Sequence, residues 1–327
     1  MRSSLIDCLR FIGLSLIILA HMPPPYILFN LRCFDVPMML FVSGMAYSNR
    51  PIDFSILFFV RRLLRLIIPV YIFLTVYFFL VIILKFLVGI DLGINMQDII
   101  GSYVLIGGIG YVWIIRVFLL ISFLTPILMT IEQNIHNDTI LFLLIVGASV
   151  LLSMAIHMGI GGGNLFVREY VYYAAGYSIP FIVGLRVMHM RRFHIFFLLI
   201  AIIMVLLCSK KIWEGERLLE INALKYPPQT YFLFYGLFVS LVCYKTCSYM
   251  HLDKHLPAIC RFIGMNSIWI YLYHIPLVQI TGTSALPWWI RYFLVYAIAV
   301  IICYIQVRIV QRLRLRHDRA IYKYLEG

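Results

Sequence analysis

Charged residues are scarce in this chain of 327 residues, because Asp, Glu, Lys and Arg together make up only 13% of it. Acidic residues are the rarer kind, with 14 Asp and Glu against 27 Lys and Arg. Apolar residues fill 63% of the sequence, and the mean hydropathy is +0.96. A soluble protein of this length has too little interior to bury so much apolar surface. The composition therefore predicts a chain that lies mostly within a membrane.

The sequence also lacks the short motifs of several enzyme classes. It contains no phosphate-cradling loop of the Walker type, no His-Glu-x-x-His zinc helix and no Gly-x-Ser-x-Gly nucleophile turn. The seven cysteines lie mostly in or beside apolar segments, and we interpret them as buried free thiols. Cys243 and Cys247 are four residues apart, but no His or Asp is suitably spaced to complete a metal site. We expect no metal and no permanently bound cofactor.

Long apolar segments fill most of the chain, each near the ~20 residues that a helix needs to cross a bilayer. The ten segments are approximately 5–21, 26–48, 64–88, 111–131, 139–157, 169–187, 193–209, 229–246, 262–281 and 289–309. The longest polar insertion between them, of about 19 residues, is too short for a second domain. We therefore predict an all-α polytopic membrane protein with about ten transmembrane helices. Residues 1–327 would form a single integral-membrane domain with no fused soluble domain.

The positive charges predict the orientation of the chain. With a cytoplasmic N-terminus, the inside loops and the C-terminal tail carry most of the Lys and Arg, as the positive-inside rule requires. Those residues include Arg50, Arg61, Arg62, Arg186, Arg191, Arg192, Lys245, Arg261, Arg308, Arg312 and Arg314. The outer loops carry mainly Lys210, Lys211, Arg217 and Lys225, diluted by three glutamates. Both termini are predicted to be cytoplasmic. The net charge of +13 would suit a nucleic-acid partner, but its clustering in loops beside apolar segments follows the positive-inside rule, so we expect no nucleic-acid partner.

Arg10 and His21 are ionisable residues inside the first apolar segment. Eleven positions apart, they lie on one face of a helix, about 16 Å from each other along its axis. Ionisable groups inside a bilayer are costly and by default mark a functional interior. Asp7 precedes Arg10 by three residues, so an ion pair between them would lower the cost of burying the arginine. The pair predicts a polar path through the membrane that contains a proton acceptor.

A basic motif, Arg61-Arg62-Leu-Leu-Arg65, stands where the chain enters the third predicted span. Two interpretations stay open at this point. The arginines are either anchors that follow the positive-inside rule or a clamp for phosphate groups, whose oxygens suit the planar guanidinium fork.

The ninth span contains Ser267, Tyr271 and His274 on one helix face, because they follow the spacing i, i+4 and i+7. His274 is either a structural hydrogen-bonding group or a functional one. Arg116 in the fourth span is a further intramembrane cation that needs a partner, and the sequence does not name one.

The second span and the segment before the eighth span carry other candidate features. Ser43 and Gly44 provide a hydroxyl and a small residue that allow a close helix approach. Arg32 and Asp35 have the spacing of an ion pair. The segment that runs Lys225-Tyr-Pro-Pro-Gln-Thr-Tyr-Phe forms either a stacking surface for a sugar or an interfacial turn.

Four of these elements, in this order, resemble the acyltransferase-3 family of bacterial integral-membrane O-acyltransferases. They are Arg10 followed by ten residues and His21, the segment 41–44, the arginines at 61, 62 and 65, and the Ile-Tyr-x-x-His segment at 270–274. The resemblance spans the chain. The segment Val-Trp-Ile-Ile-Arg at 112–116 is a looser version of the aromatic-rich fourth helix of the family. The periplasmic esterase-like domain that is fused to some members is absent from this sequence.

The resemblance implies transfer of an acyl group, usually acetyl, from cytoplasmic acyl-CoA to a sugar hydroxyl of a cell-envelope or exported polysaccharide. It implies a location in the bacterial inner membrane. CoA phosphates would bind near Arg61, Arg62 and Arg65, and His21 would act as the general base. Arg10, or alternatively Arg116, would stabilise the oxyanion. The expected partners are acyl-CoA, a glycan or lipid-linked sugar, membrane lipids and a glycan-assembly machinery.

Two other functions remain as alternatives. The chain is a transporter or flippase of glycan intermediates if Arg10, His21, Arg116 and His274 line a substrate path. It is a non-catalytic membrane partner of a glycan-assembly complex if no acyl-CoA is turned over. The sequence leaves open the acceptor, the acyl group, the choice between direct transfer and an acyl-enzyme, and the oligomeric state.

Overall fold

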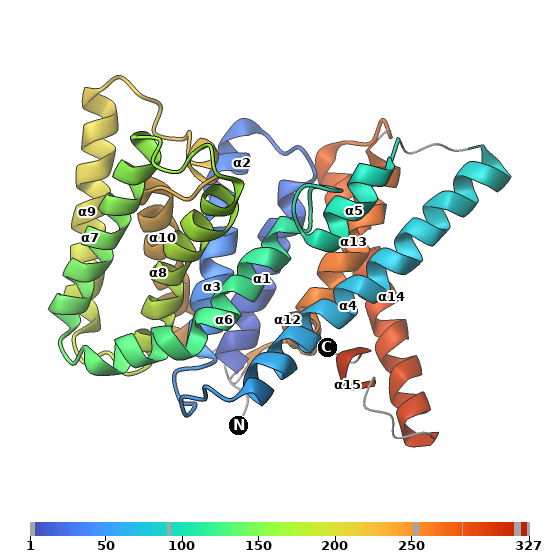
Figure 1. Cartoon of the computed structure of the whole chain (residues 1–327), viewed down its shortest axis with the longest axis horizontal. Coiled ribbons are helices and arrows are strands. Elements are labelled where there is room, and N and C mark those ends of the chain that lie inside the picture. Colours follow the sequence, from blue (N-terminus) through green and yellow to red (C-terminus); the bar gives the residue numbers. More distant parts are fainter. Residues whose placement is uncertain (1–3, 90–92, 251–254, 283, 317–321, 326–327) are drawn as a thin grey trace. The chain divides into compact units, whose positions relative to one another are not determined.

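The computed structural model describes residues 4–89, 93–250, 255–282, 284–316 and 322–325 (Figure 1). Among these residues every regular element is a helix, as the composition predicts. Contacts between Cα atoms divide the chain into two compact units. Unit 1 comprises Met1–Asp53 and Phe123–Met265, and unit 2 comprises Phe54–Ser122 and Asn266–Gly327. Helix α6 (Trp113–Asn134) begins in unit 2 and ends in unit 1. The single integral-membrane domain stays a prediction.

Seven helical stretches of the described residues are long and apolar enough to cross a membrane. They are Tyr26–Met45, Ile56–Leu87, Trp113–Asn134, Asp138–His157, Phe193–Trp213, Thr230–Tyr249 and Trp288–Arg314. Helices also occupy the other three predicted spans, but α1 has 17 residues, α8 has 16 and α13 has 15. The predicted class of a helical protein with several membrane spans is confirmed. The count of about ten and the cytoplasmic termini stay predictions.

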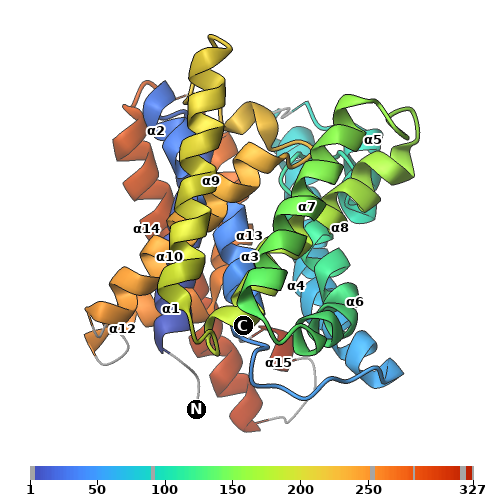
Figure 2. The same ribbon diagram turned by 90° about the vertical axis from the view of Figure 1, so that its left-hand side faces the viewer.

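Unit 1 is built around α3, which packs against α1, α8 and α10. Its helices are α1 (Ser4–Ala20), α2 (Tyr26–Leu31), η1 (Arg32–Phe34), α3 (Asp35–Met45), α7 (Asp138–His157), η3 (Val167–Val171), α8 (Tyr172–Val187), α9 (Phe193–Trp213), η4 (Asn222–Leu224), α10 (Thr230–Tyr249) and α12 (Ala258–Met265). Helices α7, α8, α9 and α10 lie side by side, and α12 packs on α1 (Figure 2). The predicted second span is therefore not one straight helix, because the short turn η1 interrupts it between α2 and α3.

The contact between α3 and α8 is the closest helix pair of unit 1. A Cβ atom added at Gly44 would overlap the carbonyl oxygen of Phe181, and one added at Gly184 would overlap the carbonyl oxygen of Phe41. Each helix therefore places a glycine against the backbone of the other, which brings the two helix axes together. The close approach that the sequence predicts at Gly44 is confirmed.

Unit 2 contains α4 (Ile56–Ile83), η2 (Leu84–Val88), α5 (Met96–Val104), α13 (Ser267–Thr281), α14 (Trp288–Arg316) and α15 (Tyr322–Leu325). Helix α13 packs against α14 and α4. Ser55 caps α4 by accepting a hydrogen bond from the backbone N–H of Phe58 at 3.2 Å. Because this cap starts the helix at Ile56, the arginines at 61, 62 and 65 lie inside α4 and not in a preceding loop.

Replacing Gly184 with alanine tests the glycine contact. We expect Gly184→Ala to lower the free energy of unfolding by about 1–3 kcal/mol, because the added methyl group forces α3 and α8 apart. Gly147→Ala in α7 is the matched control, since a Cβ there meets no atom within 4 Å. The control is expected to raise stability slightly, by up to about 1 kcal/mol. Thermal unfolding of the purified protein measures both, and equal Tm values for the two variants would contradict the packing argument.

Candidate functional site

Arg10 and His21 occur on one uninterrupted helix, as predicted. Helix α1 runs from Ser4 to Ala20, and His21 follows its last residue. The Arg10 Nη1 atom lies 3.8 Å from the Asp7 Oδ1 atom, so the predicted ion pair is present. The Asp7 side chain is only 3% exposed, whereas that of Arg10 is 25% exposed. The carboxylate thus holds the guanidinium against the helix while leaving part of it accessible.

The end of α1 places His21 at an accessible position. The backbone N–H of His21 donates to the carbonyl of Ile18 at 3.1 Å, and that of Met22 donates to the carbonyl of Leu19 at 3.1 Å. Residues 23–25 are all proline, which has no N–H and cannot continue the hydrogen-bond ladder. Met22 is fully buried, but His21 is partly exposed. His21 therefore stands where the helix stops, and the residue keeps part of its surface exposed.

A buried ion triad of Arg32, Asp35 and Lys225 lies in unit 1. The Arg32 Nη1 atom donates to the Asp35 Oδ2 atom at 2.6 Å, which confirms the predicted pair. The Lys225 Nζ atom donates to the other carboxylate oxygen, Oδ1, at 3.3 Å. The backbone N–H of Val36 donates to the same Oδ1 atom at 2.7 Å. Two cations thus share one carboxylate, and all three residues are at most 3% exposed.

Aromatic side chains surround the triad. The Arg32 guanidinium lies 4.5 Å from the centre of the Phe29 ring, and the Lys225 ammonium lies 5.5 Å from that of Tyr226. Burial lowers the pKa of Lys225, and the Asp35 carboxylate acts in the opposite direction. Within the described part of the chain, the buried Tyr177 hydroxyl has no hydrogen-bond partner. The triad is therefore a polar, net positive site enclosed by apolar and aromatic groups.

The sequence places Lys225 in an outer loop, at the start of the segment interpreted as a sugar-stacking surface or an interfacial turn, and indicates no ion-pair partner for it. The structure shows instead that it anchors the segment before α10 to the start of α3. No local pattern reveals this contact, because Lys225 and Asp35 are 190 residues apart. The one available signal was the presence of Asp35 inside a predicted span, where a carboxylate needs cationic partners.

The arginines of the basic motif lie inside α4, near its start, in unit 2, whereas Arg10 and His21 belong to unit 1. Arg61 and Arg65 are exposed and lie one helical turn apart. The Arg62 guanidinium lies 6.0 Å from the centre of the Phe58 ring and is partly covered. Two exposed guanidinium groups on one helix face suit both a phosphate clamp and a membrane anchor. Both interpretations of the basic motif therefore stay open.

Tyr271 and His274 lie together in unit 2, and Tyr111 joins them. The Tyr271 hydroxyl donates to the carbonyl of Tyr111. The imidazole of fully buried His274 stands edge-on to the Tyr111 ring, with 5.9 Å between the ring centres, and its Nδ1 atom contacts the Tyr271 carbonyl. These contacts hold α13 against the segment before α6.

Arg116 and Ser43 contact backbone carbonyls. Arg116 is 4% exposed, and its Nη1 atom donates to the carbonyl of Leu105 at 3.2 Å, where α5 ends in a left-handed residue with φ of 63°. The Ser43 hydroxyl donates to the carbonyl of Met39 in its own helix at 2.9 Å. The Ser43 hydroxyl is thus satisfied within α3, whereas Arg116 links two segments of unit 2.

These features define a class of protein: a multi-pass helical membrane protein with ionisable residues inside its helices. The family follows from comparison with known proteins. The model of the acyltransferase-3 family, described as an acyltransferase domain, matches residues 4–308. The chain belongs to this family, and the resemblance seen in the sequence is confirmed. No curated protein and no solved structure matches the chain.

Removing the shared carboxylate tests the ion triad. We expect Asp35→Asn to lower the free energy of unfolding by about 3–5 kcal/mol, because two buried cations lose their counter-charge. Lys225→Met should cost less, since Arg32 still pairs with Asp35. Glu216→Gln serves as a control, because its carboxylate pairs with Lys211 at an exposed position. Thermal unfolding ranks the three variants by their loss of stability. A loss in Glu216→Gln as large as that in Asp35→Asn would refute the importance of the triad.

Proposed function

We propose that this protein is a membrane-bound O-acyltransferase. It moves an acyl group, by default acetyl, from cytoplasmic acyl-CoA to a sugar hydroxyl of a cell-envelope or exported polysaccharide. Its proposed location is the bacterial inner membrane. The observation that carries the proposal is the family match over residues 4–308. The paired Arg10 and the accessible His21 on α1 support it, because a transfer reaction needs a proton acceptor at such a place.

His21 is the proposed general base. Its neutral imidazole accepts the proton of the acceptor hydroxyl while the hydroxyl oxygen attacks the thioester carbonyl carbon. The carbon–sulfur bond then breaks, the sugar ester is released, and the CoA thiolate takes up the proton from the imidazolium. Imidazole suits this role because its ordinary pKa lies near neutral pH. The accessible position of His21 beyond the last residue of α1 supports the assignment.

Arg10 is the proposed partner for the negative charge that develops on the thioester oxygen. A guanidinium fixed in an apolar setting stabilises an oxyanion strongly. Asp7 offsets the cost of holding Arg10 in the helix, and the guanidinium remains partly accessible. Arg116 is the alternative, but its contact with the Leu105 carbonyl and its burial favour a structural role. A direct transfer is preferred here to an acyl-histidine intermediate.

Arg61, Arg62 and Arg65 are proposed to bind the phosphate groups of CoA. The exposure of Arg61 and Arg65 at the start of α4 supports this role, because a cytoplasmic donor must reach them from water. Guanidinium forks bind phosphate oxygens with two parallel hydrogen bonds. Acyl-CoA is thus a donor substrate that is exchanged at every turnover.

The segment before α10 is proposed to contact the acceptor sugar. Tyr226 is 49% exposed, and Lys225 beside it is anchored in the ion triad. An exposed aromatic ring on a fixed segment offers an apolar face against which a sugar ring stacks. The acceptor class is a glycan or a lipid-linked sugar, and a glycan-assembly machinery would supply it.

Substitution of His21 tests the catalytic assignment. We expect His21→Ala to reduce transfer from labelled acetyl-CoA by about 10²–10⁴-fold, since general base catalysis typically contributes that much. His157→Ala is the control, because His157 is exposed at the end of α7. Assays in membranes with equal amounts of folded protein measure the effect. Full activity of a folded His21→Ala variant would show that His21 is not the base.

A double substitution tests the donor clamp separately. We expect Arg61→Ala with Arg65→Ala to raise the KM for acyl-CoA by about tenfold or more while changing kcat less, because charged hydrogen bonds to the phosphates are lost. Arg308→Ala with Arg312→Ala on α14 removes the same charge from another exposed helix face. An unchanged KM in the first variant, or an equal rise in both, would identify these arginines as membrane anchors.

A further inference from the structure

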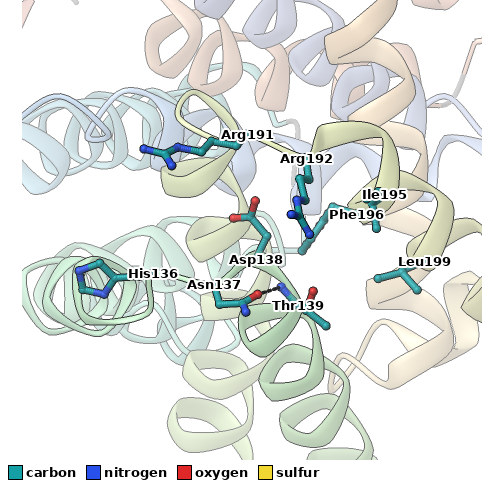
Figure 3. A pocket seen from close by; sticks show the side chains of 9 residues that line it. All are labelled: His136, Asn137, Asp138, Thr139, Arg191, Arg192, Ile195, Phe196 and Leu199. Carbon is teal, nitrogen blue, oxygen red and sulfur yellow. Dashed lines mark hydrogen bonds between the residues drawn. The ribbon is translucent and has the colours of Figure 1, made fainter.

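Unit 1 contains a hollow of about 300 Å³ at the end where the α6–α7 turn meets the α8–α9 turn. The residues that line it are His136, Asn137, Asp138, Thr139, Arg191, Arg192, Ile195, Phe196 and Leu199 (Figure 3). Its size is at the lower end of the range of small-molecule sites. None of these residues takes part in the proposed transfer reaction.

One wall of the hollow is a turn held by hydrogen bonds. The Nε atom of Arg186 donates to Asp138 Oδ1 at 2.8 Å, and its Nη1 atom donates to Glu132 Oε1 at 3.1 Å. Its Nη2 atom donates to the carbonyl of His136 at 2.8 Å. Asn137 caps α7 by accepting from the N–H of Thr139 at 2.8 Å. The wall is therefore preformed, and Arg186 offsets one of the two negative charges that Asp138 and Glu132 bring to the turn.

Two arginines at the opposite wall provide the unbalanced charge. Arg191 and Arg192 are exposed, and neither side chain has an ion-pair or hydrogen-bond partner among the described residues. Asp138 is the one carboxylate among the lining residues and is bonded to Arg186. Arg186, Arg191 and Arg192 together outnumber Asp138 and Glu132, so a net positive charge is left. The hollow is thus positively charged and open to a ligand with oxygen acceptors, such as a phosphate group.

The lining changes from charged to apolar in one direction along α9. Arg191 and Arg192 precede the helix, Ile195 follows about one turn later and Leu199 about two turns later. Figure 3 shows Ile195 and Leu199 together, away from Arg191 and His136. The apolar surface continues along α9 through the exposed side chains of Leu198, Ile202 and Val205. A ligand that matches this order has an anionic head and a long apolar tail.

We propose that this hollow binds an anionic phospholipid, with its phosphate at Arg191 and Arg192 and its acyl chains along α9. The predicted orientation places these arginines at the cytoplasmic surface, where anionic lipids are attracted by basic residues. Inorganic phosphate or CoA would also bind the guanidinium groups but would leave the apolar face of α9 unused. This proposal does not depend on the transfer reaction.

The test measures lipid binding to the purified full chain by native mass spectrometry. Phosphatidylglycerol and phosphatidylcholine with the same acyl chains are the two lipid probes, and CoA and inorganic phosphate are added as competitors. We expect the wild type to prefer phosphatidylglycerol, with binding weakened about fivefold for each arginine lost in Arg191→Gln and Arg192→Gln. Arg312→Gln with Arg314→Gln is the control, because it removes equal charge from exposed positions of α14.

Three results would overturn the proposal. The first is equal binding of phosphatidylglycerol and phosphatidylcholine by the wild type. The second is a loss of binding in the α14 control as large as that in the Arg191 and Arg192 variants. The third is displacement of the bound lipid by CoA or phosphate at the concentration at which added phosphatidylglycerol displaces it. The last result would show a general anion site. The variant Arg191→Lys with Arg192→Lys, which conserves both positive charges, should retain the preference for phosphatidylglycerol.

Discussion

The carboxylate of Asp35 is the interaction on which the organisation of unit 1 depends. In an apolar protein a buried charge is tolerated only with partners, and Asp35 has Arg32, Lys225 and the N–H of Val36. These contacts join the turn between α2 and α3 to the segment before α10, which is distant in sequence. The glycine contact between α3 and α8 then brings the next helix against the same core. The chain thus uses one paired charge and one close backbone contact to position the helix that packs against α1.

The fold class was predictable because the chain is 63% hydrophobic and its apolar segments are near the ~20 residues that a helix needs to cross a bilayer. Each predicted span contains helical residues, and the ion pairs at the i, i+3 spacing were predictable because their partners are close along the chain. The ends of the helices were less predictable. Helix α4 starts at Ile56, since Ser55 supplies a cap that hydropathy does not detect. The turn η1 was also missed, because apolar composition does not distinguish one helix from two joined helices.

The candidate site was predictable where it depends on one helix and not where it depends on distant segments. Arg10, Asp7 and His21 could be grouped from spacing alone. Lys225 could not be assigned to Asp35, and the contact of Tyr271 with the Tyr111 carbonyl had no signal in the sequence. Arg116 needed a partner because it is a cation inside a predicted span. A residue pattern cannot predict that this partner is a backbone carbonyl, here that of Leu105, because every residue has one. The family match supplies the reaction class that no single contact provides.

The central claim is that this chain transfers an acyl group to an envelope sugar. The most direct test supplies acetyl-CoA labelled in its acetyl group to membranes with and without the protein, followed by mass spectrometry of the envelope glycans. The account predicts labelled O-acetyl esters on a glycan only when the protein is present. The absence of labelled ester, together with a changed distribution of the glycan across the membrane, would contradict it and favour a transporter.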